Sequence, residues 1–152
     1  MKTHRLEREQ RLEHPIDEVF QFFSRASNLE RITPAWLSFE VLTPEPILMH
    51  IGTLIEYRLR VHRVPLRWVS RIEAWDPGRS FVDRQLRGPY GLWHHRHIFE
   101  PVEANATIVR DDVEYALPLG PLGELAHPLF VRRDVERIFE YRRQAVDRLL
   151  AS

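Results

Sequence analysis

The sequence of 152 residues contains no cysteine. Disulfide bonds, thiolate catalysis and zinc sites with cysteine ligands are therefore excluded. An excess of charge of either sign is also missing, because 22 basic side chains balance 22 acidic ones. A general nucleic-acid binder needs a basic excess to neutralise phosphates, so we expect no nucleic-acid partner.

Long apolar runs are absent as well. The stretch Met1 to Glu13 is densely charged and lacks the apolar core of a secretory signal peptide. No segment approaches the run of about 18 apolar residues that a transmembrane helix requires. We expect a cytoplasmic protein with no transmembrane segment, and the sequence is compatible with a transient contact with a membrane.

The length suits a single domain that covers residues 1–152 and buries a sizeable core. Apolar residues make up 43% and charged residues 29%, as is typical of globular proteins. The sequence shows no internal repeat and no low-complexity linker. Proline is frequent, with 11 residues, and acts as a break between strands rather than as part of a linker.

The first third of the chain predicts one strand and two short helices. Thr3 to Glu13 is polar but alternates roughly, with Leu6 and Leu12 on one side and charged residues on the other, which is typical of an edge or half-exposed strand. Pro15 fits the first turn of a helix that continues to about Ser24, with acidic residues near its start. A second short helix is expected over Ser27 to Ile32, before the break at Thr33-Pro34.

The middle of the chain is rich in β-branched and aromatic residues separated by short breaks, which predicts successive antiparallel strands. The expected strands are Phe39 to Leu42, Gly52 to Val61, Pro65 to Trp75, Ser80 to Arg87, Leu92 to Val102 and Ala106 to Leu117.

From about Pro128 to Leu150 apolar residues recur at steps of three and four, which predicts an amphipathic helix of about 20 residues and about 30 Å. An antiparallel sheet must bury one face, and this helix is the element long enough to cover it. We expect an α+β fold in which a curved antiparallel sheet closes over the helix and leaves a cavity for a ligand.

Several motifs in this order resemble one known superfamily. They are Pro15 to Phe20, Asn28 to Pro34 before Trp36, Gly52-Thr53 before Tyr57-Arg58, Phe81 to Gln85, Gly88-Pro89-Tyr90, Trp93 to Phe99, and Asp112 to Tyr115. With them the chain resembles the START/Bet v 1-like (SRPBCC) superfamily, in its polyketide cyclase/dehydrase and coenzyme-Q-binding-like branch. The resemblance implies a helix-grip fold with a cavity for a lipid, isoprenoid, quinone or polyketide, but it carries over no catalytic residue.

The strand from Leu92 to Val102 holds the most informative polar residues. Trp93, His95, His97 and Phe99 share one face, which is the more apolar one, so we expect it to point inward. A buried histidine pair can orient a ligand carbonyl or hydroxyl, because neutral imidazole both donates and accepts hydrogen bonds. The alternative is a structural role as cross-strand pairs on the solvent side.

Asp83 is a further candidate for acid–base chemistry. We favour the plainer interpretation that it forms an ion pair with Arg84 or Arg96 or caps a turn, and for Asp111 and Asp112 too we favour a structural role over one as acid or base. The His95-Arg96-His97 spacing also permits a metal site with His62 or a carboxylate as third ligand. Because no spacing supplies that ligand, we expect no metal and no cofactor.

We expect the ligand to contact residues from both the sheet and the final helix, with His95 and Asp83 as weak catalytic candidates. The expected ligand contacts are Tyr57, Trp68, Phe81, Asp83, Trp93, His95, His97, Tyr115, Ile138 and Arg142. Pro118 to Gly123 is interpreted as a mobile segment at the cavity mouth or as a simple turn.

Three functions fit these features. The sequence favours a carrier for a hydrophobic small molecule, because its candidate acid–base groups lie mostly on separate strands. The alternative is a cyclase or dehydratase-type enzyme in which His95 or Asp83 moves protons at an enolisable carbon. A third is a ligand-responsive regulator acting through Gly120 to His127 or the charged face of the final helix. A hydrogen-bonded acid–base pair in the cavity would favour the enzyme; the ligand and the oligomeric state stay open.

Overall fold

The computed structural model describes residues 2–126 and 130–151. Its strands are β1 (His4–Leu12), β2 (Glu40–Val41), β3 (Leu54–Val61), β4 (Val64–Asp76), β5 (Ser80–Arg87), β6 (Leu92–Glu103) and β7 (Ala106–Ala116). Its helices are α1 (Ile16–Phe23), α2 (Asn28–Arg31), α3 (Pro121–Ala126) and α4 (Arg132–Ala151), with a 3-10 turn at Ala35–Leu37.

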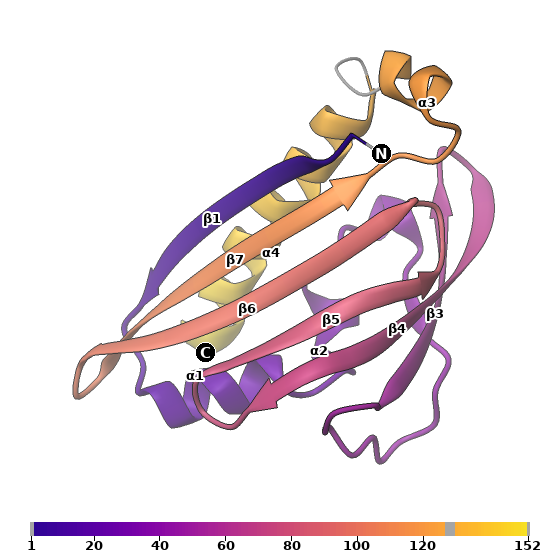
Figure 1. Cartoon of the computed structure of the whole chain (residues 1–152). Helices are drawn as coiled ribbons and strands as arrows, with labels where there is room; N and C mark the ends of the chain where they lie inside the picture. Colours follow the sequence, from indigo (N-terminus) through magenta and orange to yellow (C-terminus); the bar gives the residue numbers. More distant parts are fainter. Residues whose placement is uncertain (1, 127–129, 152) are drawn as a thin grey trace.

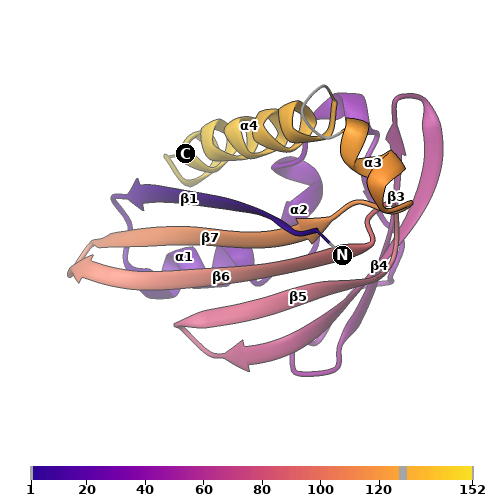
Figure 2. The same cartoon turned by 45° about the horizontal axis from the view of Figure 1, so that its top comes forward.

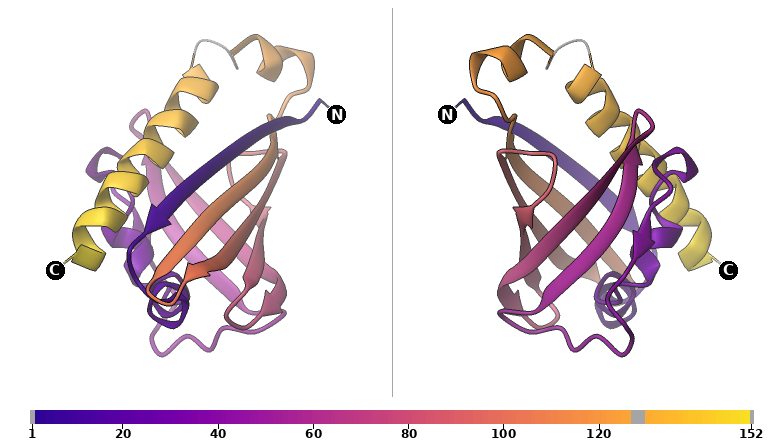
Figure 3. Two further views of the ribbon diagram at one scale, coloured as in Figure 1. Left: turned by 90° about the vertical axis from the view of Figure 1, so that its left-hand side faces the viewer. Right: turned by 90° about the vertical axis from the view of Figure 1, so that its right-hand side faces the viewer.

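The strands form one antiparallel sheet in the order β1-β7-β6-β5-β4-β3-β2 (Figure 1). The sheet is strongly curved, and α4 runs along its concave side (Figures 2 and 3). Helices α1 and α2 lie toward one end of the sheet, whereas α3 lies at the opposite end (Figure 1). The expected α+β architecture, a curved sheet around the final helix, is thereby confirmed.

Most element boundaries agree with the expectation from sequence to within two residues. The segment after β7 differs, because Pro121–Ala126 forms the short helix α3 where the glycines and prolines predicted an irregular turn. Proline is favourable in the first turn of a helix, which explains how a helix begins at Pro121. The expected start of the final helix near Pro128, and the His127 end of the proposed regulatory segment, lie outside the described residues.

Three apolar clusters fill the space between sheet and helices. One surrounds Phe99 and Val146 near α1, a second surrounds Trp93 and Val135, and a third involves Ile55 and neighbouring residues of β3 and β4. Trp93 and Phe99 belong to different clusters, so the stretch of β6 between them passes from one apolar region to the next. No helix among the described residues is long and apolar enough to cross a membrane.

Candidate functional site

Two histidines on β6 lie between these apolar clusters and are almost completely enclosed. His95 and His97 are 4% and 5% exposed, and their neighbours on the same face, Trp93 and Phe99, are 9% and 3% exposed. The prediction that this face of β6 points inward is therefore confirmed. Imidazoles in such surroundings need polar partners, because leaving a buried polar group unpaired costs about 1–3 kcal/mol.

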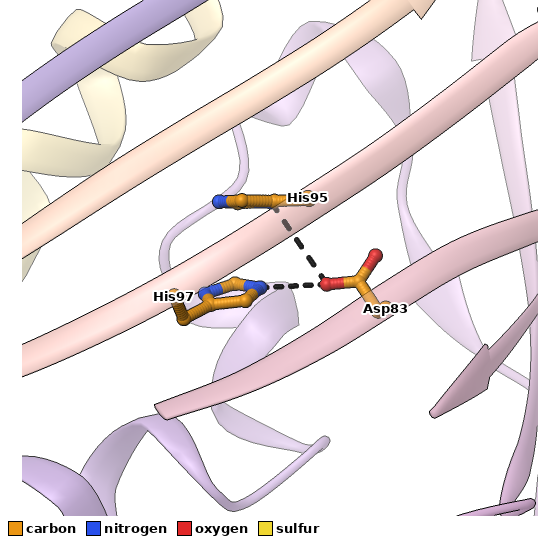
Figure 4. A group of neighbouring side chains, drawn as sticks. All are labelled: Asp83, His95 and His97. Carbon is orange, nitrogen blue, oxygen red and sulfur yellow. Dashed lines mark hydrogen bonds and ion pairs between the residues drawn. The ribbon is translucent and has the colours of Figure 1, made fainter. Parts of the chain in front are cut away.

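Asp83 on β5 and Asp111 on β7 supply these partners from the two strands that flank β6. In the strand register Asp83 lies opposite His95, and Asp111 lies opposite His97. Each carboxylate nevertheless bonds the diagonal histidine, at 2.6 Å from His97 Nε2 to Asp83 Oδ2 and 2.7 Å from His95 Nε2 to Asp111 Oδ1. We call these four residues the His–Asp cluster; Figure 4 shows three of them.

The directly opposed pairs of the His–Asp cluster are farther apart than the diagonal ones. His95 Nδ1 lies 3.9 Å from Asp83 Oδ2, and His97 Nδ1 lies 3.8 Å from Asp111 Oδ1. Both distances exceed that of a hydrogen bond. The diagonal bonds therefore orient the imidazoles and assign the Nε2 proton to each ring.

Arg142 approaches the His–Asp cluster from α4. Its Nη2 atom lies 3.6 Å from Asp111 Oδ1 and 3.5 Å from His97 Nδ1, and its side chain is only 11% exposed. The guanidinium also lies over the rings of Phe23 and Phe139, at 5.4 and 5.6 Å from their centroids. Aromatic faces and a nearby carboxylate stabilise a buried guanidinium.

A stack of rings holds the histidines in place. The His95 and His97 rings are stacked with centroids 3.6 Å apart, and Phe81 stacks on the other side of His97 at 4.2 Å. Phe139 meets His95 edge-on at 5.6 Å. Neither imidazole can rotate without displacing a neighbouring ring, so these contacts fix the orientation of both rings.

Burial and neighbouring charges set the protonation of this cluster. Burial, together with repulsion from His95, lowers the pKa of His97 to about 4 despite its bond to Asp83. Burial alone would raise the pKa of both carboxyls, but other groups outweigh it and lower both values. The hydrogen bond from His97 does so for Asp83, and the charge of Arg142 does so for Asp111. At neutral pH both carboxylates are ionised and His97 is neutral.

His95 differs from His97 in having one nitrogen available to a ligand. Both nitrogens of His97 face partners, because Nε2 donates to Asp83 and Nδ1 faces Arg142. His95 Nε2 donates to Asp111, and no hydrogen bond to a described residue occupies its Nδ1. Among these residues every fully enclosed side-chain nitrogen or oxygen has a partner, so Nδ1 must border open space. That atom is a base at the wall of the cavity.

The geometry of the same side chains argues against a metal site. One ligand atom each from Asp83, His95 and His97 lies within 4.8 Å of the others. Imidazole binds a metal through the lone pair in its ring plane, whereas these two ring planes are stacked at 23°. Their lone pairs run side by side and do not converge, so the arrangement fits hydrogen bonding and not joint coordination. His62, the third ligand considered from sequence, pairs with Asp134 at 2.6 Å.

The His–Asp cluster lies at the polar end of a cavity of about 160 Å³, which we call the inner chamber. Trp68, Trp93 and Tyr90 form an aromatic part of its wall, with Trp68 5.4 Å from Trp93 and Trp93 4.8 Å from Tyr90. Of the cluster, Asp83, His95 and His97 line it, and Arg142 joins them. The chamber wall is therefore mostly apolar, and Thr33 and Ser70 add further polar groups to it.

Most residues expected from sequence to contact a ligand lie around this cavity. Tyr57, Trp68 and Ile138 line the inner chamber, as do the polar residues and Trp93. Phe81 lies just behind His97, at a smaller cavity of about 50 Å³. Tyr115 is different: it is 3% exposed and packs against Trp93 and Tyr90 in the core, away from the walls of these cavities.

The interpretation of the aspartates needs correction. Asp83 bonds His97 and not Arg84 or Arg96, and Asp111 bonds a buried histidine. Asp112, in contrast, forms the expected surface pair, with Arg5. Sequence reasoning left Asp111 out of the site, although its alternation with Val109 and Val113 was a usable signal. It also missed Phe139, which follows the buried Val135 by four residues on α4.

Comparison with known proteins identifies the family. Residues 12–140 match the sequence profile of a family described as "Polyketide cyclase / dehydrase and lipid transport". The chain belongs to this family. It therefore falls within the SRPBCC superfamily that its motifs resemble. No curated protein sequence matches it.

Several solved structures share the fold. Protein TTHA0849 of Thermus thermophilus matches with a TM-score of 0.69 at 20% identity, covering 98% of this chain and 99% of that one. Zhui aromatase/cyclase of Streptomyces sp. R1128 gives 0.68 at 17%, covering 97% and 96%. Norcoclaurine synthase of Thalictrum flavum gives 0.69 at 13%, covering 99% and 88%. At these identities the likeness establishes the helix-grip fold alone.

Proposed function

We propose that this family member is an acid–base enzyme that removes a proton from the carbon beside a carbonyl group of an apolar ligand. The observation that carries the proposal is the available Nδ1 atom of His95, whose other ring nitrogen is bonded to the buried Asp111. A base that is oriented by a carboxylate and placed in an apolar cavity is the arrangement that proton transfer requires.

The proposed reaction uses two groups in the first step. His95 Nδ1 takes the proton from the ligand carbon, and the electron pair of the broken C–H bond moves to the carbonyl oxygen. The resulting enolate oxygen accepts a hydrogen bond from Arg142, whose guanidinium borders the inner chamber. Asp111 stabilises the imidazolium that forms on His95.

The charge of the site favours this step. Two carboxylates, the neutral His97 and one guanidinium together give the buried groups around His95 one net negative charge. The proton that arrives on His95 balances this charge inside a cavity of low polarity. Proton abstraction is therefore stabilised by groups that are already in position.

A ring closure completes the reaction without any cofactor. The enolate carbon attacks a second carbonyl group of the same ligand, and the alkoxide formed there takes the proton back from His95. The net result is a new carbon–carbon bond with no change in the number of atoms or electrons. The family description names cyclases and dehydrases, and one structural neighbour is an aromatase/cyclase, which supports a reaction of this class.

The first step can be measured without knowing the natural ligand. Acetophenone has enolisable protons and one ring, which suits a cavity close to the about 150 Å³ that holds benzene elsewhere. In D₂O, proton NMR follows the loss of its methyl signal as protons exchange. We expect the protein to accelerate exchange, and His95→Gln to lower kcat about 100-fold or more while leaving acetophenone binding within about twofold.

His94→Gln is the matched control, because His94 lies on the other face of β6 and should leave exchange unchanged. Binding of acetophenone to the wild-type protein with no accelerated exchange would contradict the enzyme proposal. That result would favour the carrier function, in which the same cavity only holds its ligand.

A further inference from the structure

A second cavity of about 280 Å³ adjoins the inner chamber, and we call it the outer chamber. The two share Leu37, Val61, Pro89, Tyr90 and Ile138 as walls. Beyond these, the outer chamber is lined mainly by apolar side chains. They include Trp36, Leu117, Leu119, Phe130 and Val131.

The inner chamber is too small for a ligand much larger than one ring, because a cavity of about 150 Å³ holds benzene. Three cavities formed by the described residues adjoin it and offer room for a larger ligand. The cavity behind His97 has about 50 Å³. The cavity beyond Arg142, between β1 and α4, is lined by charged residues that include Arg8, Glu9 and Glu140. Among these three cavities of the described residues, the outer chamber is the one that offers both space and apolar walls.

We propose that the outer chamber binds an apolar tail of the same ligand whose carbonyl head lies at the His–Asp cluster. The substrate class is then a ketone with a compact head and an aliphatic or aromatic tail. This inference rests on the proposed function for the position of the head. Burial of an apolar tail against the apolar walls of the outer chamber is favourable, whereas these walls offer a polar group no hydrogen-bond partner.

Two features of the rim fit a tail that leaves through this chamber. Leu119 and Phe130 are 78% and 57% exposed, so apolar surface continues from the chamber to its edge. Trp36 is covered by Arg137, whose guanidinium lies 5.1 Å from the ring centroid, so this wall is held in place. The polar pair at the chamber, His62 with Asp134, is satisfied within the protein. A ligand tail therefore needs no polar group there.

A series of phenyl alkyl ketones from acetophenone to octanophenone tests the proposal. Quenching of tryptophan fluorescence reports binding, because Trp68 and Trp93 line the inner chamber. We expect the Kd to fall about two- to fourfold for each added methylene until the tail reaches solvent. A Kd that does not change with tail length would overturn the proposal and leave the chamber to another occupant.

Two variants test whether the ketone tail binds in the outer chamber. Val131→Trp fills the outer chamber and should weaken octanophenone binding at least about tenfold, while acetophenone binding stays within about twofold. Phe130→Ala, at an exposed position, should weaken only the longer ketones and covers the case in which Val131→Trp does not fold. Leu122→Trp adds the same bulk on α3 at a 72% exposed position outside the lining and should change neither.

Equal losses for short and long ketones in both outer-chamber variants would contradict a separate tail site. These outcomes are independent of the exchange assay. Length-dependent binding without proton exchange would sustain the tail site and reject the enzyme. Exchange with length-independent binding would sustain the enzyme and reject the tail site.

Discussion

Three pairs of adjacent residues around the site have the same residue type but opposite directions. In each pair one side chain points into the protein and the other points outward. The pairs are His95 beside His94, Asp111 beside Asp112, and Arg142 beside Arg143. The inward member of each pair belongs to the His–Asp cluster or contacts it, and the outward member lies on the other face of its strand or on the exposed side of α4. The residue type alone therefore does not identify a residue of the site. The direction in which its side chain points does.

The aspartates show what burial adds. Asp112 forms a bidentate pair with Arg5 at 2.8 and 2.9 Å, but Arg5 is 63% exposed, so water screens the pair and it contributes little to stability. Asp111 is 12% exposed and faces a buried histidine and Arg142. Inside the sheet burial alone would raise the pKa of the Asp111 carboxyl, but the charge of Arg142, which little water screens, outweighs burial and lowers it.

The largest effect is expected from replacing the inward aspartate, Asp111, rather than the outward one, Asp112. Asp111→Asn removes the negative charge that stabilises the imidazolium of His95, although the amide oxygen can still accept its hydrogen bond. In the acetophenone exchange assay kcat should fall about 100-fold with KM nearly unchanged. Asp112→Asn should leave kcat within about twofold. A parallel rise of KM in Asp111→Asn would instead indicate a role in ligand binding.

The second effect is on the free energy of unfolding, and it compares Arg142 with Arg143. Arg142→Met leaves Asp111 buried without its guanidinium, and removing one partner of a buried ion pair costs about 3 kcal/mol. Arg143→Met changes an exposed side chain and should alter the free energy of unfolding by less than about 0.5 kcal/mol. Urea denaturation at pH 7 measures both. Equal, small changes would mean that Arg142 does not stabilise the buried carboxylate.

Sequence reasoning could identify the inward residues because strands and helices have fixed periods. Alternation on β6 placed His95 and His97 together, and the steps of three and four on α4 placed Arg142 on the covered side. These are properties of single elements, and each can be read without knowing any neighbour.

The partners could not be read in this way. Which aspartate bonds which histidine depends on the register of β5, β6 and β7 and on side-chain rotamers. The observed bonds even avoid the directly opposed residues, Asp83 with His95 and Asp111 with His97. The outer chamber depends likewise on segments far apart in the chain, such as Val61 and Leu119. Contacts between elements are the part of the site that only the structure provides.

The smallest of the three effects is the loss of folding stability as pH falls, for which we compare His97 with His94. Folding lowers the pKa of His97 from 6.5 to about 4, so between these values the unfolded chain binds more protons than the folded one. The stability from His97 is therefore full above about pH 6.5 and is lost on acidification. At about 1.4 kcal/mol per pKa unit, the loss between pH 7 and pH 5 is about 2 kcal/mol.

His97→Gln removes this titration while its amide can still donate a hydrogen bond to Asp83. The unfolding free energy of the variant, measured in urea at pH 7, 6 and 5, should therefore fall by about 2 kcal/mol less than that of the wild-type protein. His94→Gln should follow the wild-type curve, because His94 lies on the outer face of the same strand. Parallel curves for all three proteins would show that His97 takes up its proton equally well in both states, and the inward histidine would then not be the neutral group that this site requires.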